Sequence, residues 1–306
     1  MQTTTVSVVI PAYNAASLLD RCLDSVVRQT VPVREIWVVN DGSTDATGEI
    51  VEAWQNRDSR IHGIHQANQG LAGARNTGIA ASTSDWVAFL DHDDMWMPDK
   101  IERMLAARER DSEAAILYHD AVRPDGTRYL EGKGAAEGNI FDRLLRSYFI
   151  LPSTAMVRRD VLMAAGMFDV RRRRAEDYDL FLRLSPRCRF LLLNEPLAYY
   201  EQQPTSLTRN SLAMIEAQIS IFEQLVTGEL VGRLTPRQHR LASRKLAGLY
   251  YECSYHLRSV DRGKSWQALF RSLRLRPIST ATWKLALGNA WHSGGRTLHH
   301  SKKVAP

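Results

Sequence analysis

The sequence has few cysteines and no long apolar run. Its three cysteines, Cys22, Cys188 and Cys253, lie far apart and lack the paired spacing of a zinc site. We therefore expect free thiols in a reducing compartment. No uncharged segment approaches the roughly 20 residues of a membrane span. The first residues also lack the basic start and apolar core of a signal peptide. These absences predict a cytoplasmic protein.

Acidic residues are scarce at the carboxyl end of the chain. Residues 231–306 contain two acids, Glu252 and Asp261, against 15 lysines and arginines, which gives a net charge of +13. Residues 1–230 carry −7, and the chain as a whole carries +6. Such asymmetry suggests that the basic region meets an anionic surface. Charge alone does not distinguish DNA from an anionic lipid surface.

Strand and helix signals alternate over the first 110 residues. Short runs of β-branched or apolar residues predict strands at Val6–Ile10, Glu35–Val39, Ile61–His65 and Trp86–Leu90. Apolar residues recur at helical spacing between these runs. The alternation predicts a parallel sheet with helices on both faces. Right-handed crossovers then place the carboxyl ends of all four strands at one edge, where open α/β sheets bind ligands.

Polar, turn-forming residues follow each of these strands. They are found in four stretches, Pro11–Asn14, Asp41–Ser43, Asn68–Gly70 and Asp91–Asp94. We therefore expect a nucleotide-type ligand at this edge. The first stretch contains no glycine, which argues against the phosphate loop of a nucleotidyltransferase. Asn14 is a candidate cap for the helix that follows it.

Three carboxylates come together after the fourth strand. Asp91, Asp93 and Asp94 lie within four residues, and their mutual repulsion needs some compensation. A divalent cation would provide it, because Mg²⁺ binds one or two carboxylates and leaves its other positions to water and phosphate. Asp91 and Asp93, two residues apart at a strand end, suit that arrangement. The alternative is a solvated acidic turn.

The pattern becomes less regular after Arg110. Further strands are expected at Ala114–Tyr118, Ser153–Val157, Phe190–Leu193 and Leu197–Tyr200. An amphipathic helix begins near Glu176 with acids in its first turn, which the helix dipole favours. Four arginines, Arg171–Arg174, precede it, either as a solvated loop or as phosphate ligands. From Ser211 the chain is expected to be helical, with a capping box at Thr235–Gln238.

Five motifs in one order give the chain a family resemblance. They are Val8–Asn14, Val39–Asp45, Asn68–Asn76, Leu90–Asp94 and Glu176–Leu180. Together they resemble family 2 glycosyltransferases, inverting enzymes with the GT-A fold, over about residues 5–205. The resemblance implies an α/β domain at 1–210 with a mixed, mainly parallel sheet and flanking helices. Its nucleotide-sugar half would span about 1–112 and its acceptor half about 113–210, followed by a basic helical extension at 211–306.

The same resemblance implies a donor site, a metal site and a base. The donor site would consist of Pro11, Ala12, Tyr13, Asn14, Asp41, Gly70, Arg75, Asp91 and His92. Asp93 and Asp91 would hold Mg²⁺ or Mn²⁺, with Asp93 the direct ligand, and Asp177 would be the catalytic base. Two alternatives stay open, since Asp41 could simply cap the helix at Ser43–Asp45 and Arg75 could form a surface ion pair.

The chain departs from the family at one place. Many relatives have a histidine after the last core strands that can reach the metal. Here Gln202 or Gln203 occupies that place, and neither is a good ligand for Mg²⁺.

The implied activity is inverting transfer of a sugar from a UDP-, GDP- or dTDP-linked donor to a hydroxyl group. A glycan or lipid-linked acceptor in polysaccharide or glycolipid assembly is expected. Residues 231–306 combine arginines with Trp266, Phe270 and Leu273, which suits a helix at an anionic membrane surface on the inner face of the cell membrane rather than a nucleic-acid site. The alternatives are a helical cap packed on the core for this region and, for the whole chain, a non-catalytic binding protein.

Overall fold

The computed structural model describes residues 4–201, 211–277 and 283–284. The chain divides into two compact units, residues 1–209 and 210–306. No helix among the described residues is long and apolar enough to cross a membrane.

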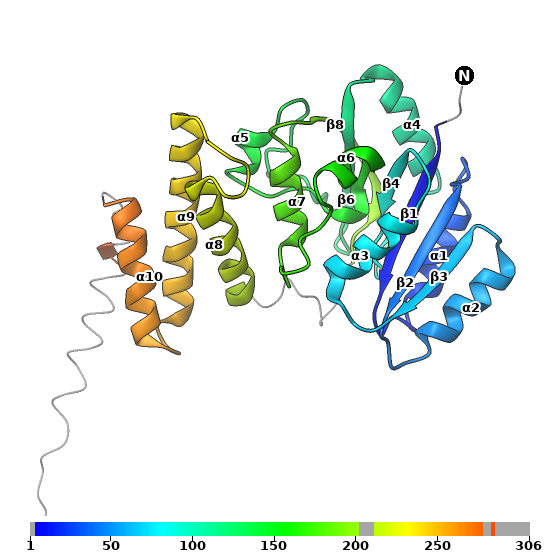
Figure 1. Ribbon diagram of the computed structural model, residues 1–306, viewed down its shortest axis with the longest axis horizontal. Helices are drawn as coiled ribbons and strands as arrows, with labels where there is room; N and C mark the ends of the chain where they lie inside the picture. The colour runs from blue at the N-terminus through cyan, green and yellow to red at the C-terminus, as the bar shows by residue number, and fades with distance from the viewer. Residues whose placement is uncertain (1–3, 202–210, 278–282, 285–306) are drawn as a thin grey trace, which may run out of the picture. The chain divides into compact units, whose positions relative to one another are not determined.

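The first unit is built on an eight-stranded sheet with the order β3-β2-β1-β4-β7-β6-β8-β5 (Figure 1). Its strands are β1 Val6–Ala12, β2 Glu35–Asp41, β3 Ile61–Gln66, β4 Trp86–Phe89, β5 Met95–Trp96, β6 Ala114–Val122, β7 Ala155–Arg158 and β8 Arg189–Tyr199. Strands β1 to β4 pair in parallel, as do β6 and β8, while β5 and β7 run antiparallel to their neighbours. The predicted mixed, mainly parallel sheet is confirmed.

Helices cover both faces of this sheet. They are α1 Leu19–Val27, α2 Thr47–Arg57, α3 Gly70–Ala81, α4 Lys100–Arg110, α5 Phe141–Leu144, α6 Arg159–Ala164 and α7 Glu176–Leu184, with a 3₁₀ turn η1 at Pro152–Thr154. The pleat of β1 divides its side chains between the two faces. Val8 and Ile10 pack in one core with α1, whereas Val9 faces α3, where a Cβ on Gly78 would meet Val9 Cγ1 at 2.5 Å. Glycine at this position therefore lets α3 lie close against the sheet.

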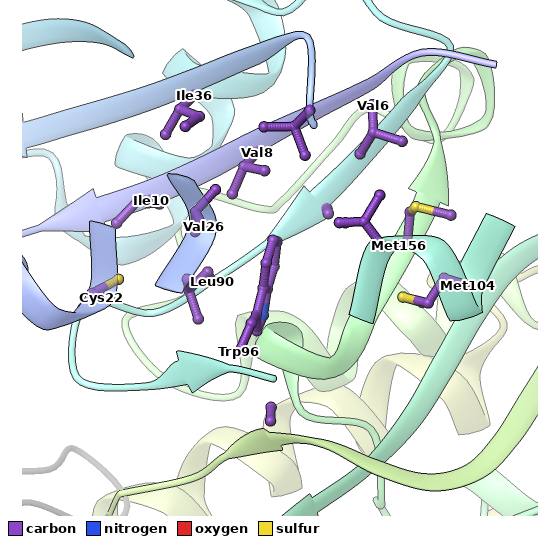
Figure 2. Packing of buried hydrophobic residues seen from close by; sticks show 14 of the residues in the cluster. Val6, Val8, Ile10, Cys22, Val26, Ile36, Leu90, Trp96, Met104 and Met156 are labelled. Atoms are coloured by element: carbon purple, nitrogen blue, oxygen red, sulfur yellow. The ribbon is translucent and has the colours of Figure 1, made fainter. Parts of the chain in front are cut away.

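The larger core lies on the α1 side of the sheet. Figure 2 shows Val8 and Ile10 of β1 with Cys22 and Val26 of α1 and with Trp96 of β5, and all five side chains are at most 3% exposed. The pleat of β1 directs Val8 and Ile10 to this face, and the helical repeat of α1 directs Cys22 and Val26 toward them. The same packing holds the carboxyl ends of the strands in a fixed register.

Three features of the first unit differ from the sequence-based expectation. The two strands expected at Phe190–Leu193 and Leu197–Tyr200 form one strand, β8, whose register against β6 shifts on either side of Asp120. Such irregularities accommodate Pro196, which cannot donate to the ladder. Strand β5 was not expected because its two residues are too short for a periodic signal. Asn14 does not cap α1, which begins at Leu19 without a side-chain cap.

The second unit consists of three described helices, α8 Ser211–Thr227, α9 Pro236–Leu257 and α10 Arg262–Leu275. Figure 1 shows α8 and α10 beside α9. The capping box is present, since Thr235 accepts the Gln238 N–H at 3.3 Å and Gln238 accepts the Thr235 N–H at 3.1 Å. The C-terminal helices expected from the sequence are therefore confirmed.

Candidate active site

The loops that follow β1, β2 and β4 are joined by hydrogen bonds at one edge of the sheet. Asn14 Oδ1 accepts the Thr44 N–H at 2.9 Å, and the Asn14 N–H donates to Ser43 Oγ at 3.0 Å. His92 Nδ1 lies 3.2 Å from the Pro11 carbonyl oxygen. Asn14 adopts a left-handed conformation with φ of 48°, which asparagine tolerates better than most residues. The polar stretches predicted to share an edge are thus in contact.

The loop after β3 joins this edge through Asp41. Asp41 is 3% exposed, and its Oδ1 accepts from Gln66 Nε2 at 2.7 Å and from the Gln69 N–H at 2.8 Å. Its Oδ2 accepts the Gly70 N–H at 2.9 Å. Asp41 therefore caps the start of α3 through the Gln69 and Gly70 N–H groups. It does not cap a helix at Ser43–Asp45, the alternative considered from the sequence. A carboxylate has about four acceptor positions, so a further donor has room.

The candidate donor residues differ in exposure. Pro11 and Ala12 are buried at the end of β1, whereas the Tyr13 side chain is 49% exposed. An exposed aromatic ring beside a polar strand edge can stack on a planar ligand. Gly70 begins α3 with φ of +80°, a conformation that favours glycine, and Arg173 Nη1 would lie 3.1 Å from a Cβ at this position.

Arg75 connects the two acidic motifs. Its side chain is 1% exposed, and it donates through Nη2 to Asp91 Oδ1 at 2.6 Å and through Nη1 to Glu176 Oε1 at 2.7 Å. Its guanidinium lies 5.2 Å from the ring centroid of Phe168. Arg75 is thus a buried cation between the loop after β4 and the first turn of α7. The surface ion pair considered for it from the sequence is wrong.

The three aspartates after β4 have different environments. Asp91 is held by Arg75, and its N–H donates to Ser153 Oγ at 3.0 Å. Asp94 is 2% exposed and accepts the Glu201 N–H at 3.0 Å. Burial, followed by the charges of Asp93 and Asp91, raises the pKa of Asp94 well above its ordinary value. Asp94 is therefore a structural residue of the loop rather than a free ligand.

Asp93 is the carboxylate that remains available. No described side chain donates a hydrogen bond to its carboxylate, whereas Arg21 Nη2 donates to its backbone carbonyl oxygen at 3.2 Å. Burial, followed by the charge of Asp91, raises the pKa of Asp93. The described residues contain no cluster of three or more metal-ligating side chains. Two carboxylates still fit Mg²⁺ or Mn²⁺, because such ions often complete their coordination with water and substrate phosphate.

Asp177 is on the first turn of α7, beside Glu176. Its Oδ2 accepts the Tyr148 hydroxyl at 2.7 Å and its Oδ1 accepts the Tyr178 N–H at 2.8 Å. Burial, followed by the neighbouring charge of Glu176, raises the pKa of Asp177 to about 7. Ala175 precedes this turn in a left-handed conformation with φ of 53°. A carboxyl group with a pKa near neutrality suits proton transfer at physiological pH.

The other acid of α7 has a structural contact. Asp179 is fully buried and accepts from Arg172 Nε at 2.6 Å and from Arg183 Nε at 2.8 Å. Arg172 is therefore part of the fold and not of a solvated loop. Arg171 forms an exposed ion pair with Asp169 at 2.9 Å.

Sequence reasoning did not identify Ser153, Tyr148 or Glu201 near the site. Each comes from the part of the chain after residue 110, where the periodic signals are weak, and each makes its contact across more than 25 positions of sequence. Gln202 and Gln203, the two candidates for the place of the family's histidine, lie outside the described residues.

The model of the family described as glycosyl transferase family 2 matches residues 7–166. The chain belongs to this family. The putative teichuronic acid biosynthesis glycosyltransferase TuaG of Bacillus subtilis is 32% identical over 208 residues, which are 67% of this chain and 82% of TuaG. The chondroitin synthase of Pasteurella multocida is 33% identical over 193 residues, 62% of this chain but 20% of the synthase.

Other family 2 relatives also match over part of their length. The uncharacterized glycosyltransferase EpsJ of Bacillus subtilis is 44% identical over 105 residues, which are 34% of this chain and 30% of EpsJ. This chain therefore covers about a third or less of several relatives that it matches.

Solved structures share the fold. TarS 1–349 of S. aureus in complex with UDP-GlcNAc superimposes with a TM-score of 0.68 at 17% identity, covering 89% of this chain and 81% of that one. The mannosyltransferase PcManGT of Pyrobaculum calidifontis in complex with GDP-Man and Mn²⁺ superimposes with a TM-score of 0.63 at 18% identity. This match covers 95% of this chain and 81% of PcManGT. The GT-A fold expected from the resemblance is confirmed.

Replacing Arg75 should destabilise the first unit strongly. Arg75→Met leaves Asp91 and Glu176 without a counter-charge in a buried site, so we expect the free energy of unfolding to fall by about 3–5 kcal/mol. The matched control is Arg103→Met, which removes a half-exposed arginine paired with Glu195 at 2.8 Å and should cost at most about 1 kcal/mol. Urea denaturation measures both changes, and equal losses in the two variants would contradict a structural role for the buried pair.

Proposed function

We propose that this chain transfers a sugar, with inversion, from a nucleoside-diphosphate sugar to a hydroxyl group of a glycan or lipid-linked acceptor in cell-surface polysaccharide or glycolipid assembly. The observation that carries the proposal is the buried Arg75, which ties the Asp91 loop to the turn that contains Asp177. In this proposal, the acidic motif at Asp91–Asp94 lies on the nucleotide side of the donor, and the carboxylate of Asp177 lies beyond it. Family membership supports the transferase over a nucleotidyltransferase.

The strand edge suits the nucleotide part of the donor. We assign base and ribose contacts to Pro11, Ala12 and Tyr13, with the exposed Tyr13 ring against the base. Asp41 would accept a hydrogen bond from the base at its remaining position. Asn14, Gly70 and His92 would complete the site near the diphosphate, and Arg75, which is buried, would act there by holding Asp91. UDP, GDP and dTDP remain candidate carriers, and the UDP-GlcNAc and GDP-Man complexes of similar folds support a nucleotide-sugar ligand.

Asp177 is assigned as the general base. In an inverting displacement the acceptor oxygen forms a bond to the anomeric carbon while the bond to the diphosphate oxygen breaks. The acceptor hydroxyl must lose its proton, and a carboxylate with a pKa of about 7 can take it. This mechanism needs no covalent nucleophile.

Asp93 and Asp91 are assigned as carboxylate ligands of Mg²⁺ or Mn²⁺. A bound cation would neutralise the charge that develops on the leaving diphosphate. Asp93 fits this role because no described side chain pairs with its carboxylate, and burial followed by the charge of Asp91 raises its pKa. Arg75 fixes the position of Asp91 and leaves Asp93 available.

A non-catalytic nucleotide-sugar or anionic-surface binding protein is the second candidate. It would use the same strand edge but would not need a proton acceptor near neutrality. The environment of Asp177 favours the enzyme. Hydrolysis or transfer of a nucleotide sugar by the purified protein separates the two candidates.

We also propose that the reaction occurs at the inner face of the membrane, with the second unit near the anionic surface. Helix α10 exposes Phe270 at 62%, and Arg274 and Arg276 are exposed close by. Trp266 stacks on Phe270 with ring centroids 5.7 Å apart. Aromatic and basic side chains on one helix suit an interfacial position. Leu269, in contrast, is fully buried, so α10 is also part of the packing of its unit.

Asp93→Asn should weaken Mn²⁺ binding and abolish transfer, because one of the two carboxylate ligands is neutralised. The matched control is Asp94→Asn, whose carboxyl group is buried and bonded to the backbone, and which should still bind Mn²⁺. Electron paramagnetic resonance of Mn²⁺ in the presence of UDP or GDP measures binding independently of activity. Unchanged Mn²⁺ affinity in Asp93→Asn, or full turnover in EDTA, would contradict the assignment.

Asp177→Asn should preserve folding and donor binding but lower transfer by roughly 10²–10⁴-fold, the usual size of a general-base contribution. The wild-type rate should rise with pH through about 7, since the base acts in its ionised form and the pKa of Asp177 is raised to about 7. Initial rates of transfer between about pH 5 and pH 9, a range that includes this pKa, give both results. Near-normal turnover of Asp177→Asn with loss in Glu176→Gln would place the base at Glu176 instead.

The exposed face of α10 should determine binding to anionic vesicles. Truncation before α10 would remove buried residues such as Leu269, so point variants are the better test. Phe270→Ser, and separately Arg274→Glu with Arg276→Glu, should reduce sedimentation with vesicles that contain phosphatidylglycerol, while high salt should release the wild type. Gln267→Ser, an exposed polar change on the same helix, is the control. A wild-type protein that ignores these vesicles at low salt would show that α10 serves only to pack its unit.

A further inference from the structure

Tyr148 lies in the segment between α5 and η1, outside the motifs that mark the family. The Tyr148 hydroxyl donates to Asp177 Oδ2 at 2.7 Å. The two residues are 29 positions apart in sequence and belong to different elements. This contact links the least patterned part of the first unit to the carboxylate assigned as the base.

The ring of Tyr148 is held in place by its neighbours. It stacks on Tyr178 with ring centroids 4.6 Å apart and an interplanar angle of 24°. The Tyr178 hydroxyl donates to the Leu144 carbonyl oxygen at 2.5 Å. Phe149 and Ile150, which follow Tyr148, are at most 1% exposed. The position of the Tyr148 hydroxyl is therefore set by packing and does not depend on the bond to Asp177.

The carboxylate of Asp177 has few other partners. Among the described residues, Tyr148 is the one side chain that donates to it, and the Tyr178 N–H is the other donor. Arg75 directs its two hydrogen bonds to Asp91 and Glu176. Within the described part of the chain, Arg75 therefore makes no hydrogen bond to Asp177, and Tyr148 is the side chain that contacts its Oδ2.

We propose that Tyr148 is a positioning residue for the base: its fixed hydroxyl orients the Asp177 carboxylate toward the acceptor hydroxyl. This inference rests on the proposed function. During transfer the acceptor proton moves to Asp177, the acceptor oxygen bonds to the anomeric carbon, and the electron pair of the broken bond leaves with the diphosphate. Tyr148 keeps its own proton throughout and donates to the carboxylate.

Removal of this donor changes the titration of the base in a known direction. The groups that face Asp177 are Glu176, which raises its pKa, and Arg75 and Tyr148, which lower it; Tyr129 is also near enough to interact. Burial acts first and raises the pKa. Without the Tyr148 hydroxyl the ionised carboxylate loses a stabilising hydrogen bond, so the pKa rises further by about one unit.

The test compares Tyr148→Phe with Tyr178→Phe, which removes the hydroxyl of the stacked partner ring and keeps the backbone N–H. In Tyr148→Phe, the acidic limb of the plot of kcat/KM against pH should shift to higher pH by about one pH unit. At a pH below the pKa, kcat/KM should therefore fall about tenfold. The KM for the donor should not change. The limb should stay in place in Tyr178→Phe. An unmoved limb in Tyr148→Phe, or equal movement in both variants, would overturn the proposal.

A second measurement does not need turnover. The carboxyl ¹³C resonance of Asp177, assigned by its disappearance in Asp177→Asn, is titrated in the folded wild type and in both tyrosine variants. The midpoint should rise in Tyr148→Phe alone, and an unchanged midpoint overturns the inference. Absence of transfer from any UDP-, GDP- or dTDP-sugar would count against the proposed function, whereas the titration would still decide the role of Tyr148.

Discussion

The buried guanidinium of Arg75 is the constraint on which the site depends. A charged side chain that is 1% exposed needs groups of opposite charge beside it. Arg75 has two such groups, the carboxylates of Asp91 and Glu176. The first belongs to the loop after β4 and the second to the first turn of α7. One side chain on α3 therefore fixes the distance between the two acidic motifs and ties three elements of the first unit together.

The pairing by Arg75 also decides which acids remain available for chemistry. Glu176 is occupied by Arg75, Asp94 by the Glu201 backbone, and Asp179 by two arginines. Asp91 pairs with Arg75 through Oδ1, and its other oxygen is the one proposed for the metal. Among the described residues, no cation forms an ion pair with Asp93 or Asp177, and the pKa of each is raised. Carboxyl groups with a shifted pKa are more frequent in functional sites than elsewhere in a protein. The separation of structural from available acids supports different duties for Asp93 and Asp177.

Much of the site could be predicted from local sequence because it follows the strands. The carboxyl ends of β1 to β4 share an edge by the rules of parallel sheets, so the polar stretches at Pro11 and Asp91 had to lie close together. The role of Asp41 as a cap of α3 was not predictable, because its partners lie 25 to 29 positions away. The contacts of Tyr148 were missed for the same reason. Long-range hydrogen bonds leave no periodic signal in sequence, whereas strands and amphipathic helices do.

We propose that this member of family 2 carries out a one-step displacement with a base at Asp177. The configuration of the newly formed glycosidic bond tests it most directly. Proton NMR of the product made from an α-linked nucleotide sugar should show a β-linkage, since a single displacement inverts the anomeric carbon. An α-linked product would mean net retention and would contradict the account, because retention needs a different arrangement of groups around the anomeric carbon.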